Sequence, residues 1–210
     1  SLKSADSLWH WQQKGRTMEY GALVFSLLFF GAFAIYLFFG VYIIHIDPKG
    51  TLNRVFFALC VALCIWSLGF AMANSAPTHA ICLRWRRISA FGWGSVYCIL
   101  LHFVLLLSGR KCVQKPLPLC SLIYLPAVIN VFGYCLLDFA KTQYNLTRAR
   151  FGWINLGVQS NLDMFFNIHY ISYVLLSIAF LWMLRRKAQD GHLKKQSSRI
   201  KPGRIWGCPV

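Results

Sequence analysis

The chain has 210 residues, of which 57% are hydrophobic and only 13% are charged. Because soluble domains carry about 25% charged residues, this composition excludes an ordinary water-soluble globular domain. The chain has 22 Lys and Arg residues against six Asp and Glu, a balance that would suit a nucleic-acid-binding protein. These bases lie in short clusters between apolar runs, as in membrane proteins that touch anionic lipid, so we predict a lipid bilayer as partner and no nucleic acid.

Apolar runs separated by short turns and basic clusters make up most of the chain. About 20 helical residues span roughly 30 Å of hydrocarbon, and each run comes close to this length or exceeds it. The turn sequence Asp47-Pro48-Lys49-Gly50 ends the first run, as is typical of turn residues. We predict an all-α fold, a polytopic transmembrane helix bundle of about five spans over residues 20–46, 55–73, 88–109, 117–137 and 164–184.

The two ends of the chain differ from its middle. Residues 1–17 are polar and precede Met18, and we expect them to be a non-native or disordered leader. Residues 18–198 form the predicted membrane region. Residues 199–210 are punctuated by Pro and Gly, so we predict an irregular tail, as an out-of-frame ending would give.

The distribution of bases predicts the orientation in the membrane. Eight Lys and Arg residues follow the last apolar run, and the positive-inside rule places them in the cytoplasm. Five crossings then put the N-terminus outside, together with the expected loops 74–87 and 138–163. The cluster Arg84-Trp85-Arg86-Arg87 opposes this orientation, although arginines at the start of a helix can snorkel. We predict a multi-pass protein of the bacterial cytoplasmic (inner) membrane.

The predicted spans contain few residues that could carry out catalysis or ion transport. They hold no acid and no base beyond their ends, and charges within membranes usually mark ion pathways. No hydrolase motif is present, so we predict no catalytic residue and no enzyme activity in this chain. Cys60 and Cys64 share a helix face, but no second pair completes a metal site, and we predict none.

Two histidines in different spans raise the question of a cofactor. His102 lies within the third span and His169 near the start of the fifth, and a pair of histidines can ligate haem. The simpler interpretation is that each is neutral and hydrogen-bonded between helices. We favour the latter and predict no cofactor.

Aromatic and amide residues gather toward the predicted outer ends of the spans. Such a set could line a cavity that is apolar with a few polar groups. The enrichment of Trp and Tyr at membrane interfaces favours the alternative of an aromatic belt with packing. The candidate residues for binding a small-molecule or membrane-derived signal are Trp66, Phe70, Asn74, Trp85, Trp93, Trp153, Asn167 and Tyr170.

Several of these aromatic residues stand in motifs that resemble a known family. The chain is similar, over about residues 20–198, to the N-terminal seven-helix membrane sensor region of bacterial histidine kinases, which also occurs ahead of diguanylate cyclases. The motifs are Asn53-Arg54, Trp66-Ser67-Leu68-Gly69-Phe70, Trp85-Arg86-Arg87-Ile88 with Gly92 and Phe103, and Phe151-Gly152-Trp153 with Tyr170 and Tyr173.

The resemblance implies seven helices, an external N-terminus, a cytoplasmic output module and a homodimer. This chain has five predicted spans, so we expect a sensor region that is truncated after its fifth helix and lacks its output domain. We predict the membrane-embedded sensory input region of a two-component-type signalling receptor. The alternative is a small transporter-like or accessory membrane protein, for which the scarcity of charges within the spans is unfavourable.

Overall fold

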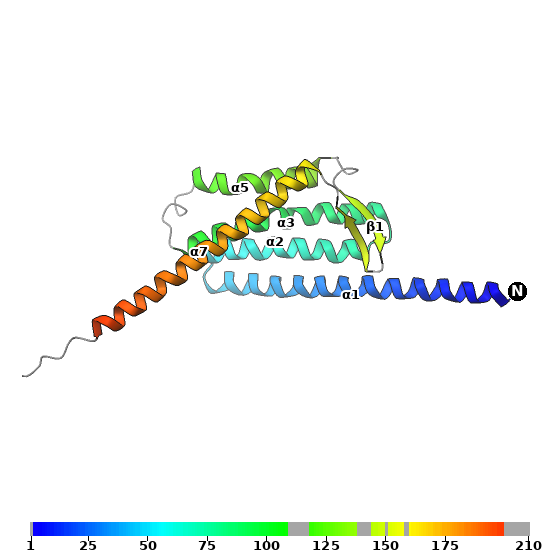
Figure 1. Ribbon diagram of the computed structural model, residues 1–210, viewed down its shortest axis with the longest axis horizontal. Helices are drawn as coiled ribbons and strands as arrows, with labels where there is room; N and C mark the ends of the chain where they lie inside the picture. The colour runs from blue at the N-terminus through cyan, green and yellow to red at the C-terminus, as the bar shows by residue number, and fades with distance from the viewer. Residues whose placement is uncertain (1, 109–117, 138–143, 150, 158–159, 200–210) are drawn as a thin grey trace, which may run out of the picture.

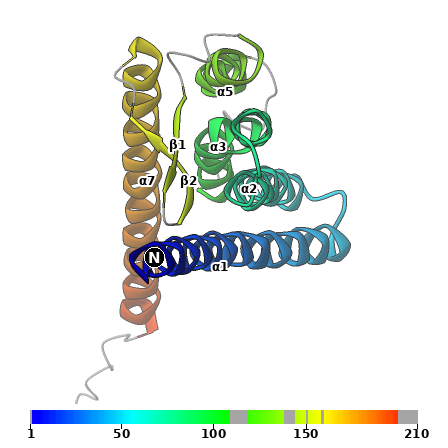
Figure 2. The ribbon, with the colours of Figure 1, turned by 90° about the vertical axis from the view of Figure 1, so that its right-hand side faces the viewer.

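The computed structural model describes residues 2–108, 118–137, 144–149, 151–157 and 160–199. Its helices are α1 (Leu2–Ile46), α2 (Thr51–Asn74), α3 (His79–Leu107), α5 (Pro118–Val131), the π-helix η1 (Phe132–Leu136) and α7 (Asn161–Arg199). In Figure 1, α1, α2, α3 and α5 lie along one another and α7 crosses them obliquely. Figure 2 shows α7 on one side of this bundle. The prediction of an all-α polytopic bundle is confirmed.

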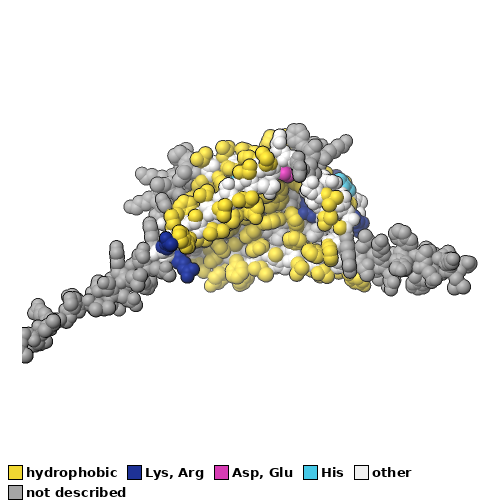
Figure 3. Space-filling model, viewed as in Figure 1, with side chains coloured by type: hydrophobic (Ala, Val, Ile, Leu, Met, Phe, Trp, Pro, Cys, Tyr) yellow, Lys and Arg dark blue, Asp and Glu magenta, His cyan; other side chains and the backbone are white. Residues whose placement is uncertain are grey.

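In the described part of the chain, four helices are long and apolar enough to cross a membrane, namely Tyr20–Ile46 of α1, α2, α3 and Asn161–Arg186 of α7. The fourth predicted span corresponds to a shorter apolar helix, Ser121–Leu136. Hydrophobic side chains cover the middle of the face in Figure 3, with Lys and Arg side chains toward its edges. Large apolar residues of the bundle such as Leu28 and Leu175 are exposed, and such exposure is stable only where lipid or protein covers these side chains.

Small residues bring α2 and α3 close together at the centre of the bundle. A Cβ atom on Gly69 would lie 2.5 Å from the Cβ of Ser89, and one on Gly92 would lie 2.5 Å from the amide nitrogen of Trp66. Membrane helices pack through such small residues, because lipid gives no hydrophobic drive for association. α2 also packs along α1, and α3 along α5 and α7.

Local polar contacts set the ends of several helices. The Asp47 side chain accepts hydrogen bonds from the backbone of Lys49 and Gly50, which closes the turn between α1 and α2. Asn53 at the start of α2 donates to the Ile43 carbonyl near the end of α1, over 3.3 Å. Thr78 and Ser160 accept from backbone amides in the first turns of α3 and α7, as N-caps do.

Predicted boundaries differ from the structure most at α1, α3 and α7, and α7 runs to Arg199, beyond the predicted end of the fifth span at residue 184. α3 begins at His79 rather than at residue 88, so most of the expected loop 74–87 is helical and the arginine cluster lies within a helix. α1 begins at Leu2, so its first turns include the predicted leader; whether residues 1–17 are native stays a prediction. The tail beyond residue 199 lies outside the described residues.

The expected loop 138–163 contains a β-hairpin that the sequence analysis did not predict. Strands β1 (Asn145–Ala149) and β2 (Gly152–Leu156) pair antiparallel, with Thr147 opposite Ile154. The hairpin packs on α1 and α2 at the end of the bundle where α2 ends and α3 begins. We call this the hairpin end; the turn between α1 and α2 lies at the opposite end.

Candidate functional site

A buried arginine holds the hairpin to the bundle. Arg86 comes from the third turn of α3 and is 8% exposed. Its guanidinium donates to the Trp153 carbonyl over 2.7 Å and to the side-chain oxygen of Asn74 over 3.4 Å. It also lies 4.0 Å from the centre of the Phe70 ring, within range of a cation–π interaction. These partners are neutral, so Arg86 is held by dipoles and an aromatic face.

Gly152 and Trp153 of the hairpin complete this arrangement, which we call the clasp (Phe70, Asn74, Arg86, Gly152 and Trp153). Gly152 has a φ of +101°, which favours glycine. A Cβ atom there would lie 2.9 Å from the Asn74 carbonyl oxygen. The Trp153 indole donates to the Ala76 carbonyl over 2.8 Å. The hairpin is therefore joined to the α2–α3 turn by backbone and side-chain contacts.

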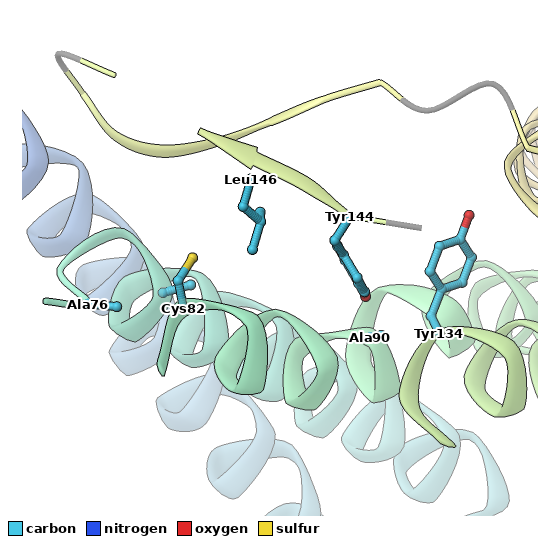
Figure 4. Packing of buried hydrophobic residues seen from close by; sticks show 7 residues of the cluster. Ala76, Cys82, Ala90, Tyr134, Tyr144 and Leu146 are labelled. Carbon is cyan, nitrogen blue, oxygen red and sulfur yellow. The ribbon is translucent and has the colours of Figure 1, made fainter. Parts of the chain in front are cut away.

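A hydrophobic cluster lies beneath the hairpin. Figure 4 shows Leu146 of β1 and Tyr144 above Cys82 and Ala90 of α3, with Tyr134 of η1 beside them. Burial of such side chains contributes about 25 cal/mol per Å² of apolar area. The hairpin is thus anchored both by hydrogen bonds and by apolar contact.

An aromatic cluster extends from there to the start of α7. The ring centres of Trp93 and Phe166 are 4.7 Å apart, and those of Trp93 and Tyr134 are 4.8 Å apart. Phe166 also stacks on Tyr170. The Tyr134 hydroxyl donates to the Asp163 carboxylate in the first turn of α7. α3, η1 and α7 therefore meet through aromatic edges and one charged hydrogen bond.

The two histidines lie in separate polar contacts. His169 of α7 is 4% exposed; its Nε2 lies 3.3 Å from the sulfur of Cys98, and its Nδ1 lies 3.1 Å from the amide nitrogen of Asn130. His102 Nδ1 lies 2.9 Å from the Tyr124 hydroxyl. Each histidine is thus hydrogen-bonded between helices, as the simpler interpretation had it. Within the described ranges, no group of three or more His, Cys, Asp or Glu could hold a metal ion.

The eight predicted binding residues fall into two groups and a remainder. Phe70, Asn74 and Trp153 meet in the clasp, and Trp66 contacts Phe70 with ring centres 6.2 Å apart. Trp93 and Tyr170 belong to the aromatic cluster around Phe166. Trp85 packs against the cluster beneath the hairpin, and Asn167 lines an open hollow at the start of α7. A role of these residues in binding stays a prediction.

Sequence reasoning missed the residue at the centre of the clasp. The sequence places Arg86 in the expected outer loop 74–87, because it precedes the uncharged run that begins at residue 88. The signal that could have revealed it is periodicity: Cys82, Arg86, Ser89 and Ala90 occupy one helical face, and all are buried. The helix begins nine residues before the predicted span 88–109, so the arginine cluster lies within α3 near its start.

The clasp and the helices around it define a multi-pass membrane protein with a structured cap at one end. A comparison with family profiles matches residues 22–200 to the family described as the N-terminal 7TM region of histidine kinase, and the chain belongs to this family. Searches among curated proteins and among solved structures each gave no match. The family motifs noted in the sequence supply four of the five residues of the clasp, all except Asn74. They are Trp66-Ser67-Leu68-Gly69-Phe70, Trp85-Arg86-Arg87 and Phe151-Gly152-Trp153.

Tyr144 offers a test of how tightly the hairpin is packed. It is 8% exposed, and its hydroxyl has no hydrogen-bond partner in the described part of the chain. We expect Tyr144→Phe to stabilise the fold by about 1 kcal/mol, because a buried unpaired hydroxyl costs free energy. Denaturant unfolding in micelles measures this. Tyr42→Phe, at an exposed site on α1, is the control; a less stable Tyr144→Phe protein would contradict the prediction.

The same residue predicts a pH dependence. Burial raises the pKa of Tyr144 above its ordinary value, because the charged phenolate is poorly solvated. Above about pH 10 the unfolded chain then loses this proton before the folded chain does, so stability falls as the pH rises. We expect Tyr144→Phe to lose less stability than the wild type over this range. Equal losses in both proteins would count against the assignment.

Proposed function

We propose that this chain is the sensory input region of a two-component-type signalling receptor. The observation that carries the proposal is the convergence of family motifs from separate segments on one clasp, in a chain that belongs to the histidine kinase 7TM family. α7 starts at the same end of the bundle as the clasp. The helix contacts α3 and continues past the opposite end of the bundle. A change at the hairpin end would therefore move the helix that leads to the C-terminus.

Such a change needs two helix arrangements with different affinity for the signal. In the described arrangement, the clasp fixes the hairpin to α2 and α3, and the bond between Tyr134 and Asp163 fixes the start of α7. A signal that binds more tightly to an arrangement in which these contacts are broken would favour that arrangement and so move α7. Shifts of about 1–2 Å are enough in known switching helices.

We place the hairpin end outside and the opposite end in the cytoplasm of a bacterial inner membrane. Lys49 lies in the turn between α1 and α2, and Arg54 lies in the first turns of α2. Arg185 and Arg186 lie in the later part of α7, which runs toward this opposite end. These bases agree with the positive-inside rule. The cluster Arg84-Trp85-Arg86-Arg87 argues less strongly against this orientation than its sequence indicates. Arg86 is buried and hydrogen-bonded in the clasp, so it does not act as a loop charge that follows the positive-inside rule. Labelling of engineered surface cysteines with an impermeant reagent would test the orientation.

In this proposal the chain acts by changing helix packing and carries no catalytic residue of its own. The implied partners are the bilayer, a small-molecule or membrane-derived signal and a second copy of the chain. Cross-linking in membranes at native expression would test for the dimer.

A reporter assay tests the sensory function. The chain through Arg199 is joined to the cytoplasmic part of a reporter histidine kinase, and kinase output is measured in cells. We expect Arg86→Met in the clasp to change output at least threefold, whereas the exposed Arg84→Met should not, at equal membrane levels. If both variants match the wild type, the hairpin end does not control output.

The alternative of a small transporter-like protein draws on one observation. Cys98, Asn130 and His169 form a buried polar chain across α3, α5 and α7, and transporters bind substrates between helices at such polar sites. Solute flux in proteoliposomes that His169→Phe abolishes would favour this alternative. Flux equal to that of empty liposomes would oppose it.

A further inference from the structure

An open hollow of about 750 Å³ lies where the end of β2 meets the start of α7. Its volume is in the range of small-molecule sites, about 300–1,000 Å³. Residues of both elements line it, and those that define its chemistry are Asn155, Ser160, Asp163, Asn167, Ile168 and Ile171. The hollow is adjacent to the clasp and the aromatic cluster but includes none of the clasp residues.

The charge of the lining favours a cation. Asp163 is the one ionisable side chain among the described residues that line the hollow, which include no Lys, Arg or His. Its Oδ1 accepts from Tyr134, and a carboxylate offers about four acceptor positions, so capacity for a ligand remains. Asn155 uses its side-chain oxygen to accept from the Asn145 backbone, which leaves its amide hydrogens for other partners.

The start of α7 does not favour an anion, although helix N-termini often do. The backbone amide of Asp163 donates to the Ser160 hydroxyl and that of Met164 to the Ser160 carbonyl. The Asp163 carboxylate also sits in the first turn, where it complements the helix dipole. The positive end of the helix is therefore already compensated.

The lining changes from polar to apolar along α7. Asp163 lies in the first turn, while Ile168 and Ile171 follow at positions that also line the hollow. Asp163 and Ile171 are eight positions apart, which corresponds to about 12 Å along the helix. Because α7 is a candidate membrane span, the polar part lies toward the membrane surface and the apolar part toward the lipid.

We propose that this hollow binds an amphipathic ammonium compound, with its head at Asp163 and Asn167 and its apolar tail along Ile168 and Ile171. A free alkylammonium and an ammonium-bearing lipid headgroup share this chemistry. The signalling consequence rests on the proposed function: the positive head shares the Asp163 carboxylate with the Tyr134 hydroxyl, which weakens that hydrogen bond and loosens α7 from η1. Phe166, which also lines the hollow, contacts Trp93 at 4.7 Å and so links the site to a reporter residue.

The binding test uses the full chain with 5-fluorotryptophan in maltoside micelles, whose head groups are neutral. Butyltrimethylammonium is titrated while the fluorine resonance of Trp93, assigned with Trp93→Phe, is followed by NMR. We expect a saturable shift, and at least tenfold weaker binding of butyrate. A lack of saturation, or equal binding of butyrate, would overturn the proposal.

Variants at the exposed Asn167 change the charge of the site without altering the packed core. We expect Asn167→Asp to tighten binding and Asn167→Lys to weaken it, each roughly three- to tenfold, as one added charge at close range does near a surface. Ala80→Asp and Ala80→Lys, exposed on α3, carry the same charges outside the hollow and should leave affinity unchanged. If the Ala80 variants shift affinity as much as the Asn167 variants, the binding is not at the hollow.

Two further comparisons show whether the ligand is a lipid or a soluble amine, and whether its binding controls the reporter output. If phosphatidylethanolamine shifts the Trp93 resonance and phosphatidylglycerol does not, the ligand is a lipid headgroup; a response to the free amine alone identifies a soluble ligand, and both results support the site. Binding without any change in reporter output would leave the site in place and refute its signalling role. If reporter output depends on Arg86 but no ammonium compound binds the hollow, the proposed site is refuted and the proposed sensory function is not.

Discussion

Gly92→Ala should strongly destabilise the bundle. An added Cβ would collide with the carbonyl oxygen of Ala62 and lie 2.5 Å from the amide nitrogen of Trp66. Both atoms belong to the backbone of α2, so neither can turn aside as a flexible side chain would. Overpacking of this kind typically costs about 1–3 kcal/mol, and we expect the upper end of that range, because α2 and α3 must separate along their contact.

The matched control is Gly31→Ala in α1. Among the described residues, no atom outside the adjoining backbone of α1 lies within 4 Å of a Cβ placed there, and alanine has the higher helix propensity. We expect Gly31→Ala to be neutral or slightly stabilising in the same thermal unfolding measurement. If the two variants unfold at the same temperature, close approach of α2 and α3 is not what stabilises the bundle.

The second large effect is expected for Arg86→Met, which should release the hairpin. The substitution removes the hydrogen bond to the Trp153 carbonyl and the contact with the Phe70 ring, but keeps an apolar stem of similar length. Hydrogen bonds to charged groups contribute about 1.5–3 kcal/mol, and the lost desolvation cost of the buried charge offsets part of this. We expect the free energy of local opening of the hairpin to fall by about 2 kcal/mol. This corresponds to roughly 30-fold faster hydrogen exchange of the hairpin amides.

Hydrogen exchange of the backbone amides of β1 and β2 measures this opening. Arg84→Met is the control, because Arg84 lies on the same helix and is exposed. The effect should be confined to the hairpin and the α2–α3 turn, with little change in the middle of the bundle. If the hairpin amides of Arg86→Met exchange as slowly as those of the control, the buried charge costs as much free energy as its contacts contribute. The clasp is then held by apolar packing and by the hydrogen bond from Trp153 to Ala76.

The close packing of α2 on α3 was only partly readable from the sequence. Gly69 and Gly92 stand in the motifs that resemble the sensor family, and small residues are common at membrane helix contacts. Gly31 is equally small and lies nearer the middle of its run, yet among the described residues it meets no neighbouring helix. Which glycine is a contact depends on how each helix is rotated against its neighbour, and that is not a local property.

The sequence by itself determined that the chain crosses a membrane several times as helices and that it resembles the sensor family. Both conclusions rest on local features, since a long apolar run without charges must satisfy its backbone hydrogen bonds internally as a helix. Only the tertiary structure decided that Arg86 is buried, that a hairpin caps the bundle, and that Asp163 lies beside Tyr134. These are contacts between residues 67 and 29 positions apart. They exist because several helices pack at once, and no single run of sequence contains that information.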